Sequence, residues 1–223
     1  MTLTREHQSF LSRWEAPLLQ ALASRLPGGI NPDHLTLFGC LGACVVLGGG
    51  FAARLDSVFL WLSNLGLVIH WLGDSLDGTL ARERRIERPR YGFFIDQMTD
   101  VITNLLVALG IAAAGYARLD ITLLVLVGYQ MLSAYSLIQS AVTGNFLVSI
   151  DGFGPTEVRI CIIVLNSLVY FLGAPRFQVF GVEVTWADGV LMTGFVAMLF
   201  LFARGFVQEA RRLSSEEPPH KAR

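Results

Sequence analysis

Four aspartates recur at regular spacing in the first half of the chain. Asp74 and Asp77 close one hydrophobic segment, in the order Asp-x-x-Asp-Gly-x-x-Ala-Arg, and Asp96 and Asp100 lie inside the next one. At about 100° per residue, the members of each pair fall on one face of a helix. Carboxylates within apolar segments are costly unless a cation compensates them, so the pattern indicates a functional site.

The chemistry that such a cluster favours is the metal-assisted transfer of a phosphate group. Converging carboxylates repel one another at low dielectric, and divalent ions with oxygen ligands compensate them. Mg²⁺ or Mn²⁺ commonly bridge carboxylates to substrate phosphates. Gly78 and Ala81 remove side-chain bulk from the same face, so a ring or a diphosphate can approach the backbone, and Arg82 can meet diphosphate oxygens. Helix capping or ion pairing explains one such aspartate, but not four in register.

The elements that position these residues are expected to be helices in a membrane. Of the 223 residues, 53% are hydrophobic and 16% are charged, which is typical of a polytopic membrane protein. We expect an all-α fold in which an amphipathic helix at 5–26 lies in the membrane interface and six transmembrane helices follow. The expected domains are 1–34 (interfacial helix and turn), 35–207 (transmembrane catalytic domain) and 208–223 (a polar, frayed cytoplasmic tail). The six spans are expected at 35–53, 57–81, 93–115, 119–143, 157–174 and 187–207.

Basic residues predict the orientation. The 82–92 loop carries five arginines, whereas the opposite-side loops hold single arginines. The positive-inside rule therefore places both termini, this loop and the aspartates on the cytoplasmic side of what we expect to be a bacterial inner membrane. The first thirty residues contain several charges and no clean apolar run, so no cleavable signal sequence is expected.

The aspartate pattern resembles the signature of the CDP-alcohol phosphotransferase (CDP-alcohol phosphatidyltransferase) family, integral membrane enzymes that make phospholipids. Every position of the motif matches, and the segment 31–36 before the first span is similar as well. The resemblance implies a two-metal centre of Mg²⁺ or Mn²⁺ bound by Asp74, Asp77 and Asp96, with Asp100 contributing a ligand and serving as catalytic base. It also implies nucleotide or diphosphate binding by Gly78, Ala81, Arg82, Gly92 and Thr36.

The implied reaction is attack of an alcohol oxygen on the β-phosphorus of a CDP-alcohol, with CMP as leaving group. The implied partners are the CDP-alcohol, a hydroxyl acceptor, membrane lipids and a second copy of the chain in a homodimer. No nucleic-acid partner is expected.

The acceptor is left open between two classes. Thr156-Glu157-Val158 is similar to a segment of choline and ethanolamine phosphotransferases, whose acceptor is diacylglycerol. In family members that join CDP-diacylglycerol to an anionic polar alcohol, arginines from late spans bind the acceptor phosphate, a role open to Arg159 and Arg204. His70 completes the candidate acceptor pocket. The alternative interpretation makes Glu157 part of a capped helix start and His70 a packed, hydrogen-bonding residue.

Two other functions use similar residues. Intramembrane prenyltransferases bind Mg²⁺-diphosphate through aspartate pairs, but they have more spans and separate their two motifs into different halves of the chain. A small cation transporter would use the carboxylates as its ion site, but such proteins tend to show internal repeats and midplane sites. An assay of CMP release separates the first function from both.

Overall fold

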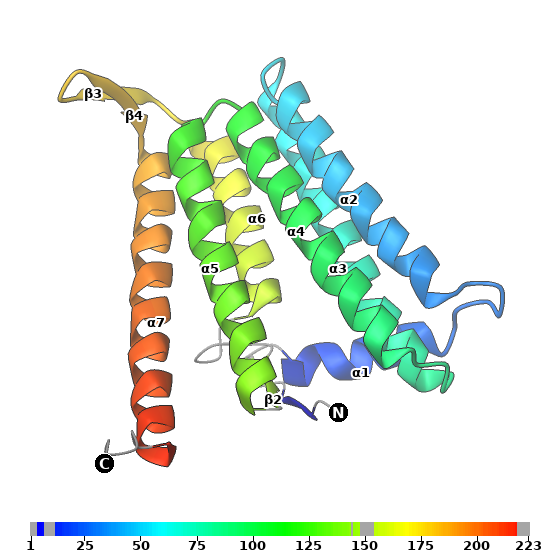
Figure 1. The fold of residues 1–223 in the computed structure, drawn as a ribbon. Coiled ribbons are helices and arrows are strands. Elements are labelled where there is room, and N and C mark those ends of the chain that lie inside the picture. Colours follow the sequence, from blue (N-terminus) through cyan, green and yellow to red (C-terminus); the bar gives the residue numbers. More distant parts are fainter. Residues whose placement is uncertain (1–3, 7–11, 144, 148–153, 218–223) are drawn as a thin grey trace, which may run out of the picture.

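Seven α-helices make up most of the part of the chain that the structure describes (Figure 1). The computed structural model describes residues 4–6, 12–143, 145–147 and 154–217. Helices α2 to α7 run alternately up and down, so the start of α2, the α3–α4 connection and the end of α7 share one end of the bundle. The helices are α1 (Ser12–Ala23), α2 (Pro32–Ala52), α3 (Leu60–Glu83), α4 (Pro89–Ala113), α5 (Leu119–Thr143), α6 (Pro155–Leu172) and α7 (Trp186–Glu216), with the 3-10 turn η1 (Ser57–Phe59) before α3.

Five of the helices, α2, α4, α5, α6 and α7, are long and apolar enough to cross a membrane. The predicted all-helical membrane protein is therefore confirmed, whereas its count of six spans is not. Helix α3 has the length of a span, with 24 residues, but it carries Asn64, His70, Asp74 and Asp77, which lower its apolar character.

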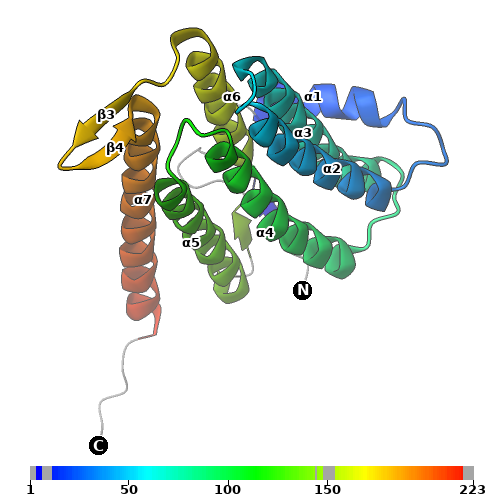
Figure 2. The ribbon, with the colours of Figure 1, turned by 90° about the horizontal axis from the view of Figure 1, so that it is seen from above.

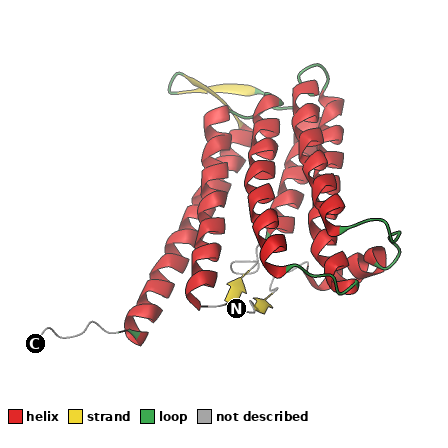
Figure 3. Cartoon of the chain, turned by 45° about the vertical axis from the view of Figure 1, so that its right-hand side comes forward, coloured by secondary structure: helices red, strands yellow, loops and turns green. Residues whose placement is uncertain are grey.

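The described chain also contains short strands that the sequence did not predict. Strand β1 (Thr4–Glu6) pairs in parallel with β2 (Asn145–Leu147), and β3 (Arg176–Val179) forms an antiparallel hairpin with β4 (Val182–Thr185). Figure 3 shows the two pairs at opposite ends of the bundle. Helix α7 continues to Glu216, well past the predicted end at 207, and Arg212 forms ion pairs with Glu209 and Glu216 along its last turns. Residues 218–223 of the predicted tail lie outside the described residues.

Helix α1 lies at the lower end of the bundle in Figure 1 and packs against α3. It occupies part of the predicted amphipathic segment, of which residues 7–11 lie outside the described residues. Leu19 and Ala23 are buried against a small apolar cluster that includes Leu76 and Leu80 of α3, whereas the Trp14 side chain is 81% exposed. One face of α1 therefore supports the end of α3 that carries the aspartates.

Helices α2 and α3 approach each other backbone to backbone. An added Cβ at Gly42 would collide with the backbone nitrogen of His70, and one at Gly66 would lie 2.7 Å from the backbone nitrogen of Val46. Small residues permit this close approach between membrane helices, where packing rather than the hydrophobic effect drives association. The contact fixes the height of α3 relative to α2.

A buried polar network joins α3 to α6. The Asn166 side chain donates to the Asn64 side-chain oxygen at 2.9 Å, and the Tyr116 hydroxyl donates to the Asn166 oxygen at 2.6 Å. Asn166 is thus the interhelical polar residue that its position in an apolar segment predicts. The network holds α6 at a fixed height beside α3.

We predict that Gly42→Ala destabilises the protein by about 1–3 kcal/mol, because the added methyl group forces α2 and α3 apart. Gly48→Ala is the matched control, since an added Cβ there meets nothing within 4 Å and alanine is the better helix former. Thermal unfolding in detergent measures both. Equal melting temperatures for the two variants would show that the helices are not packed this tightly.

Candidate active site

Three of the four motif aspartates converge between α3 and α4. One carboxylate oxygen from each of Asp74, Asp96 and Asp100 lies within 4.8 Å of the others, and all three residues are half-buried. Asp74 comes from the second half of α3, and the other two come from the first half of α4. Both helices pack on α2, which positions the two aspartate-bearing faces.

The three carboxylates fit a divalent metal ion. Each offers a hard oxygen ligand, and the ligand atoms are close enough to surround one cation, as Mg²⁺ and Mn²⁺ sites require. Carboxylate repulsion at this spacing also favours a bound cation. The site can therefore hold a metal.

Asp77 lies beside this group of three rather than within it. Its Oδ2 accepts a 2.6 Å hydrogen bond from the Thr36 hydroxyl of α2, and its Oδ1 accepts one from the backbone N–H of Gly78. The contact places Thr36, a predicted diphosphate-binding residue, next to the motif. Asp77 keeps lone pairs for a further ligand, because a carboxylate offers about four acceptor positions.

Arg159 of α6 forms an ion pair with the motif. Its guanidinium donates to Asp74 Oδ2 at 2.6 Å and lies 3.3 Å from His70 Nε2. The Arg159 side chain is only 11% exposed and the Asp74 side chain 22%, so the pair is largely shielded from solvent. Such a pair is retained only where its geometry is good, and removal of one partner leaves a costly buried charge.

A small cavity opens beside the cluster. Its walls come from α2, α3 and α4, so it lies where the three helices meet. The lining residues are Thr36, Gly39, Cys40, His70, Asp74, Thr99, Asp100 and Thr103.

The other predicted nucleotide-binding residues surround the aspartates. Arg82 follows the motif on α3, where it donates to the Thr79 hydroxyl at 3.2 Å. Gly92 lies in the first turn of α4, and a Cβ added there would meet nothing within 4 Å, so the space beside it is open. Gly78 and Ala81 are half-buried on α3. Their roles in binding stay predictions.

The predicted acceptor-pocket residues separate into two groups. His70 and Arg159 contact each other beside Asp74, so the structure brings these two to the site. Glu157 accepts a 2.9 Å hydrogen bond from the backbone N–H of Gly154 at the start of α6, which is the capped helix start of the alternative interpretation. Arg204 lies on α7, whose main packing partner is α5.

Two further loop arginines, besides Arg82, have partners within the protein. Arg84 donates to the backbone carbonyls of Leu26, Pro27 and Ile30 at 2.6–2.9 Å, and so holds the α1–α2 connection against the end of α3. Arg88 forms a two-pronged pair with Asp33 at 2.5 and 2.6 Å. These contacts fix the loop that joins the two halves of the motif.

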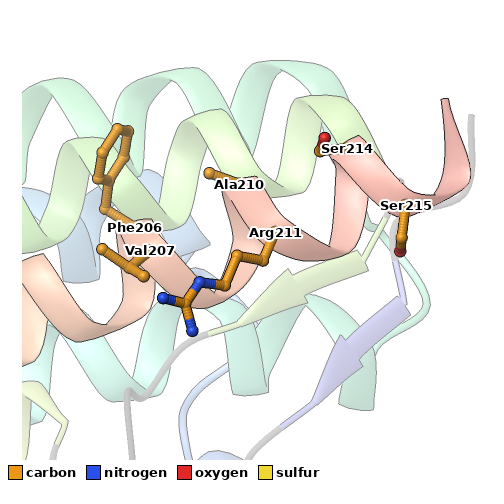
Figure 4. A pocket seen from close by; sticks show the side chains of 6 residues that line it. All are labelled: Phe206, Val207, Ala210, Arg211, Ser214 and Ser215. Atoms are coloured by element: carbon orange, nitrogen blue, oxygen red, sulfur yellow. The ribbon is translucent and has the colours of Figure 1, made fainter. Parts of the chain in front are cut away.

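A second hollow lies on the surface of α7, on a different helix from the aspartates. Figure 4 shows its lining side chains along the last turns of that helix, and Arg211 is the only charged one among them. No motif residue reaches it. The lining residues are Phe206, Val207, Ala210, Arg211, Ser214 and Ser215.

The protein is therefore a helical membrane protein with a carboxylate cluster that could hold a metal ion. The sequence model of the CDP-alcohol phosphatidyltransferase family matches residues 30–204, and the chain belongs to that family. It is therefore a CDP-alcohol phosphotransferase, as the resemblance implied.

The sequences of two curated relatives match much of the chain. An archaetidylinositol phosphate synthase of Pyrococcus horikoshii is 32% identical over 140 residues, which cover 63% of this chain and 70% of the relative. An archaetidylinositol phosphate synthase of Methanothermobacter thermautotrophicus is 31% identical over 166 residues, which cover 72% of this chain and 76% of the relative.

The sequence did not predict the ion pair between Arg159 and Asp74. It placed Arg159 near the aspartates at the cytoplasmic ends of the helices and offered the neighbouring Glu157 as a local charge partner, whereas the structure pairs Arg159 with Asp74. Only the side-by-side packing of α3 and α6 brings residues so distant in the chain together. The cavity residues Thr99 and Thr103 were also missed, although they extend the Asp96–Asp100 face of α4 at helical spacing.

We predict that Asp96→Asn lowers CMP release by about two orders of magnitude or more, because fixed charges at the reacting phosphate supply much of the rate. Chelation should stop the wild-type reaction, and Mg²⁺ or Mn²⁺ should restore it. Asp120→Asn is the control, since Asp120 lies at the other end of the bundle in an exposed pair with Arg118. If both variants keep wild-type turnover, the cluster is not the active site.

Proposed function

We propose that this enzyme transfers a phospholipid group from a CDP-activated lipid alcohol to a phosphorylated polar alcohol, with inositol phosphate as the leading acceptor. The observation that carries the proposal is the buried guanidinium of Arg159 beside Asp74. The names of the two relatives support it, since both make a lipid-linked inositol phosphate. The argument for diacylglycerol, the other acceptor class, rests on the segment Thr156-Glu157-Val158. The capping contact of Glu157 at the start of α6 gives that residue a structural role instead.

Arg159 suits an anionic acceptor. A guanidinium binds phosphate through paired, charge-assisted hydrogen bonds, and these are stronger where solvent is excluded. With a neutral acceptor such as diacylglycerol, the Arg159 guanidinium would serve only to compensate Asp74. We infer that Arg159 holds the acceptor phosphate while its contact with Asp74 keeps it beside the reacting group.

The aspartates would hold two divalent ions, Mg²⁺ or Mn²⁺, with Asp74, Asp77, Asp96 and Asp100 as ligands. When bound, such ions neutralise the diphosphate and the charge that develops on the leaving CMP. Asp100 accepts the proton of the acceptor hydroxyl while the hydroxyl oxygen forms a bond to the β-phosphorus. The bond from that phosphorus to the bridging oxygen breaks, and CMP leaves with the bridging oxygen.

The remaining motif residues bind the nucleotide in this proposal. Gly78 and Ala81 leave room for the cytidine against α3, while Arg82 binds diphosphate oxygens. Gly92 leaves the start of α4 open to the substrate, and Thr36 orients Asp77 through its hydroxyl.

The placement in the membrane is part of the proposal. We take α3 as the sixth span, because it packs closely on α2 and its polar residues have partners on α2 and α6. Helix α1 would lie in the interface with Trp14 at headgroup depth. The arginine-rich 82–92 loop then places both termini and the active site in the cytoplasm, with the enzyme acting as a homodimer.

A substrate panel tests the proposal. Purified enzyme would receive CDP-diacylglycerol or its diether analogue with inositol phosphate, inositol, glycerol 3-phosphate or serine, and CDP-choline with diacylglycerol. CMP release should require a CDP-activated lipid and be fastest with a phosphorylated acceptor. Turnover of CDP-choline with diacylglycerol alone would overturn it.

We predict that Arg159→Gln raises the KM for a phosphorylated acceptor by about 10- to 100-fold, because a hydrogen bond to a charged group contributes roughly 1.5–3 kcal/mol. The KM for the CDP-alcohol should change little. Arg204→Gln is the matched control, as it removes the other late-span arginine. An effect of Arg204→Gln without one of Arg159→Gln would assign the acceptor phosphate to α7 instead.

We predict that Asp100→Asn lowers turnover by about 10²- to 10⁴-fold, the usual contribution of a general base, while metal-dependent binding of the CDP-alcohol falls only modestly. Asparagine keeps the size of the side chain but accepts no proton. Binding and turnover are measured on the same preparation. A collapse of both together would make Asp100 chiefly a metal ligand.

A further inference from the structure

The β3–β4 hairpin is amphipathic, and the reaction at the opposite end of the bundle does not use it. Its register pairs Phe177 with Val184 and Val179 with Val182, so these four side chains share one face. The remaining pairs, Arg176 with Thr185 and Gln178 with Glu183, form a polar face. An isolated two-stranded hairpin is only marginally stable in water, so we expect an apolar surface to cover the apolar face.

Most of the apolar face is exposed within the described chain, whereas Val184 near its root is half-buried. The side chains of Phe177, Val179 and Val182 are 53%, 46% and 40% exposed, and Phe180 at the tip is fully exposed. Phe180 also has a φ of 52°, a region that bulky residues rarely adopt. An aromatic side chain kept at such a position points to a role for the tip rather than for the turn.

The position of the hairpin favours lipid as its partner. Its two strands connect the end of α6 to the start of α7, both helices that are apolar enough to span a membrane. In Figures 1 and 2 the hairpin extends outward beyond α7, away from the other helices. Figure 3 shows it nearly edge-on at the level of the helix ends, where the membrane surface would lie.

The root of the hairpin is fixed to the bundle. The Trp186 indole N–H donates to the Gly173 carbonyl at 2.8 Å, and the Thr185 hydroxyl donates to the Tyr116 carbonyl at 2.7 Å. Tryptophan is enriched at the boundary between lipid and water. A root fixed at that boundary would let the outward strands lie along the membrane surface.

We propose that the hairpin is a membrane-surface anchor whose apolar face, with Phe177, Val179 and Val182, inserts into the lipid leaflet opposite the active site. On the polar face, Gln178 and the Arg176–Glu183 ion pair are exposed, whereas Thr185 at the root contacts the bundle. The anchor would resist tilting of α7, which packs mainly on α5.

Single cysteines that carry a fluorescent probe test this anchor in lipid bilayers. Val179→Cys labels the apolar face, and Gln178→Cys, the neighbouring residue on the polar face, is the matched control. The exposed native Cys44 and Cys161 are first replaced, while Cys40 of the active-site cavity is kept. Labelling of this background without an added cysteine measures the contribution of Cys40, and CMP release confirms that the protein is intact. Brominated phospholipid should quench the Val179 probe several-fold more than the Gln178 probe, and aqueous iodide should show the reverse order.

Two results would overturn the anchor. Equal iodide quenching of both probes would show that the apolar face lies in water. Protection of the Val179 probe from iodide and from brominated lipid alike would show that protein, such as a second copy of the chain, covers it.

Discussion

The concentration of negative charge between α3 and α4 is the constraint on which the rest of the structure depends. Two unit charges 4 Å apart repel by about 4 kcal/mol at an effective dielectric constant of 20, and three carboxylates here lie within 4.8 Å of one another. Arg159 compensates one of them. The remaining charge suits the cluster to hold divalent cations, which in the proposed reaction would also bind the diphosphate of the substrate.

The fold meets this constraint with rigid contacts on both sides of the cluster. On one side, glycines let α2 and α3 touch through their backbones, so that Asp77 reaches the Thr36 hydroxyl. On the other side, Asn166 and Arg159, two turns apart on α6, both bind polar groups of α3. Most polar side chains of α3 therefore have partners on α2 or α6. These partners let a helix of weak apolar character remain inside the bundle.

The aspartate motif was predictable from the sequence because its information is local. Helical periodicity alone places Asp74 with Asp77 and Asp96 with Asp100, and the family resemblance assigns them a chemistry that the family match supports. The ion pair of Arg159 was not predictable, since it depends on the packing of helices distant in sequence. The β3–β4 hairpin was missed for a different reason: its strands are four residues each, shorter than the alternation needed to distinguish them from a loop.

The stoichiometry of bound Mn²⁺, measured by electron paramagnetic resonance on the purified enzyme with a CDP-alcohol, tests the central claim most directly. We expect two ions per chain whose spectra show that they are close together, and no tight binding when Asp74, Asp96 and Asp100 are all asparagine. Equal Mn²⁺ binding by the wild type and that triple variant would contradict it.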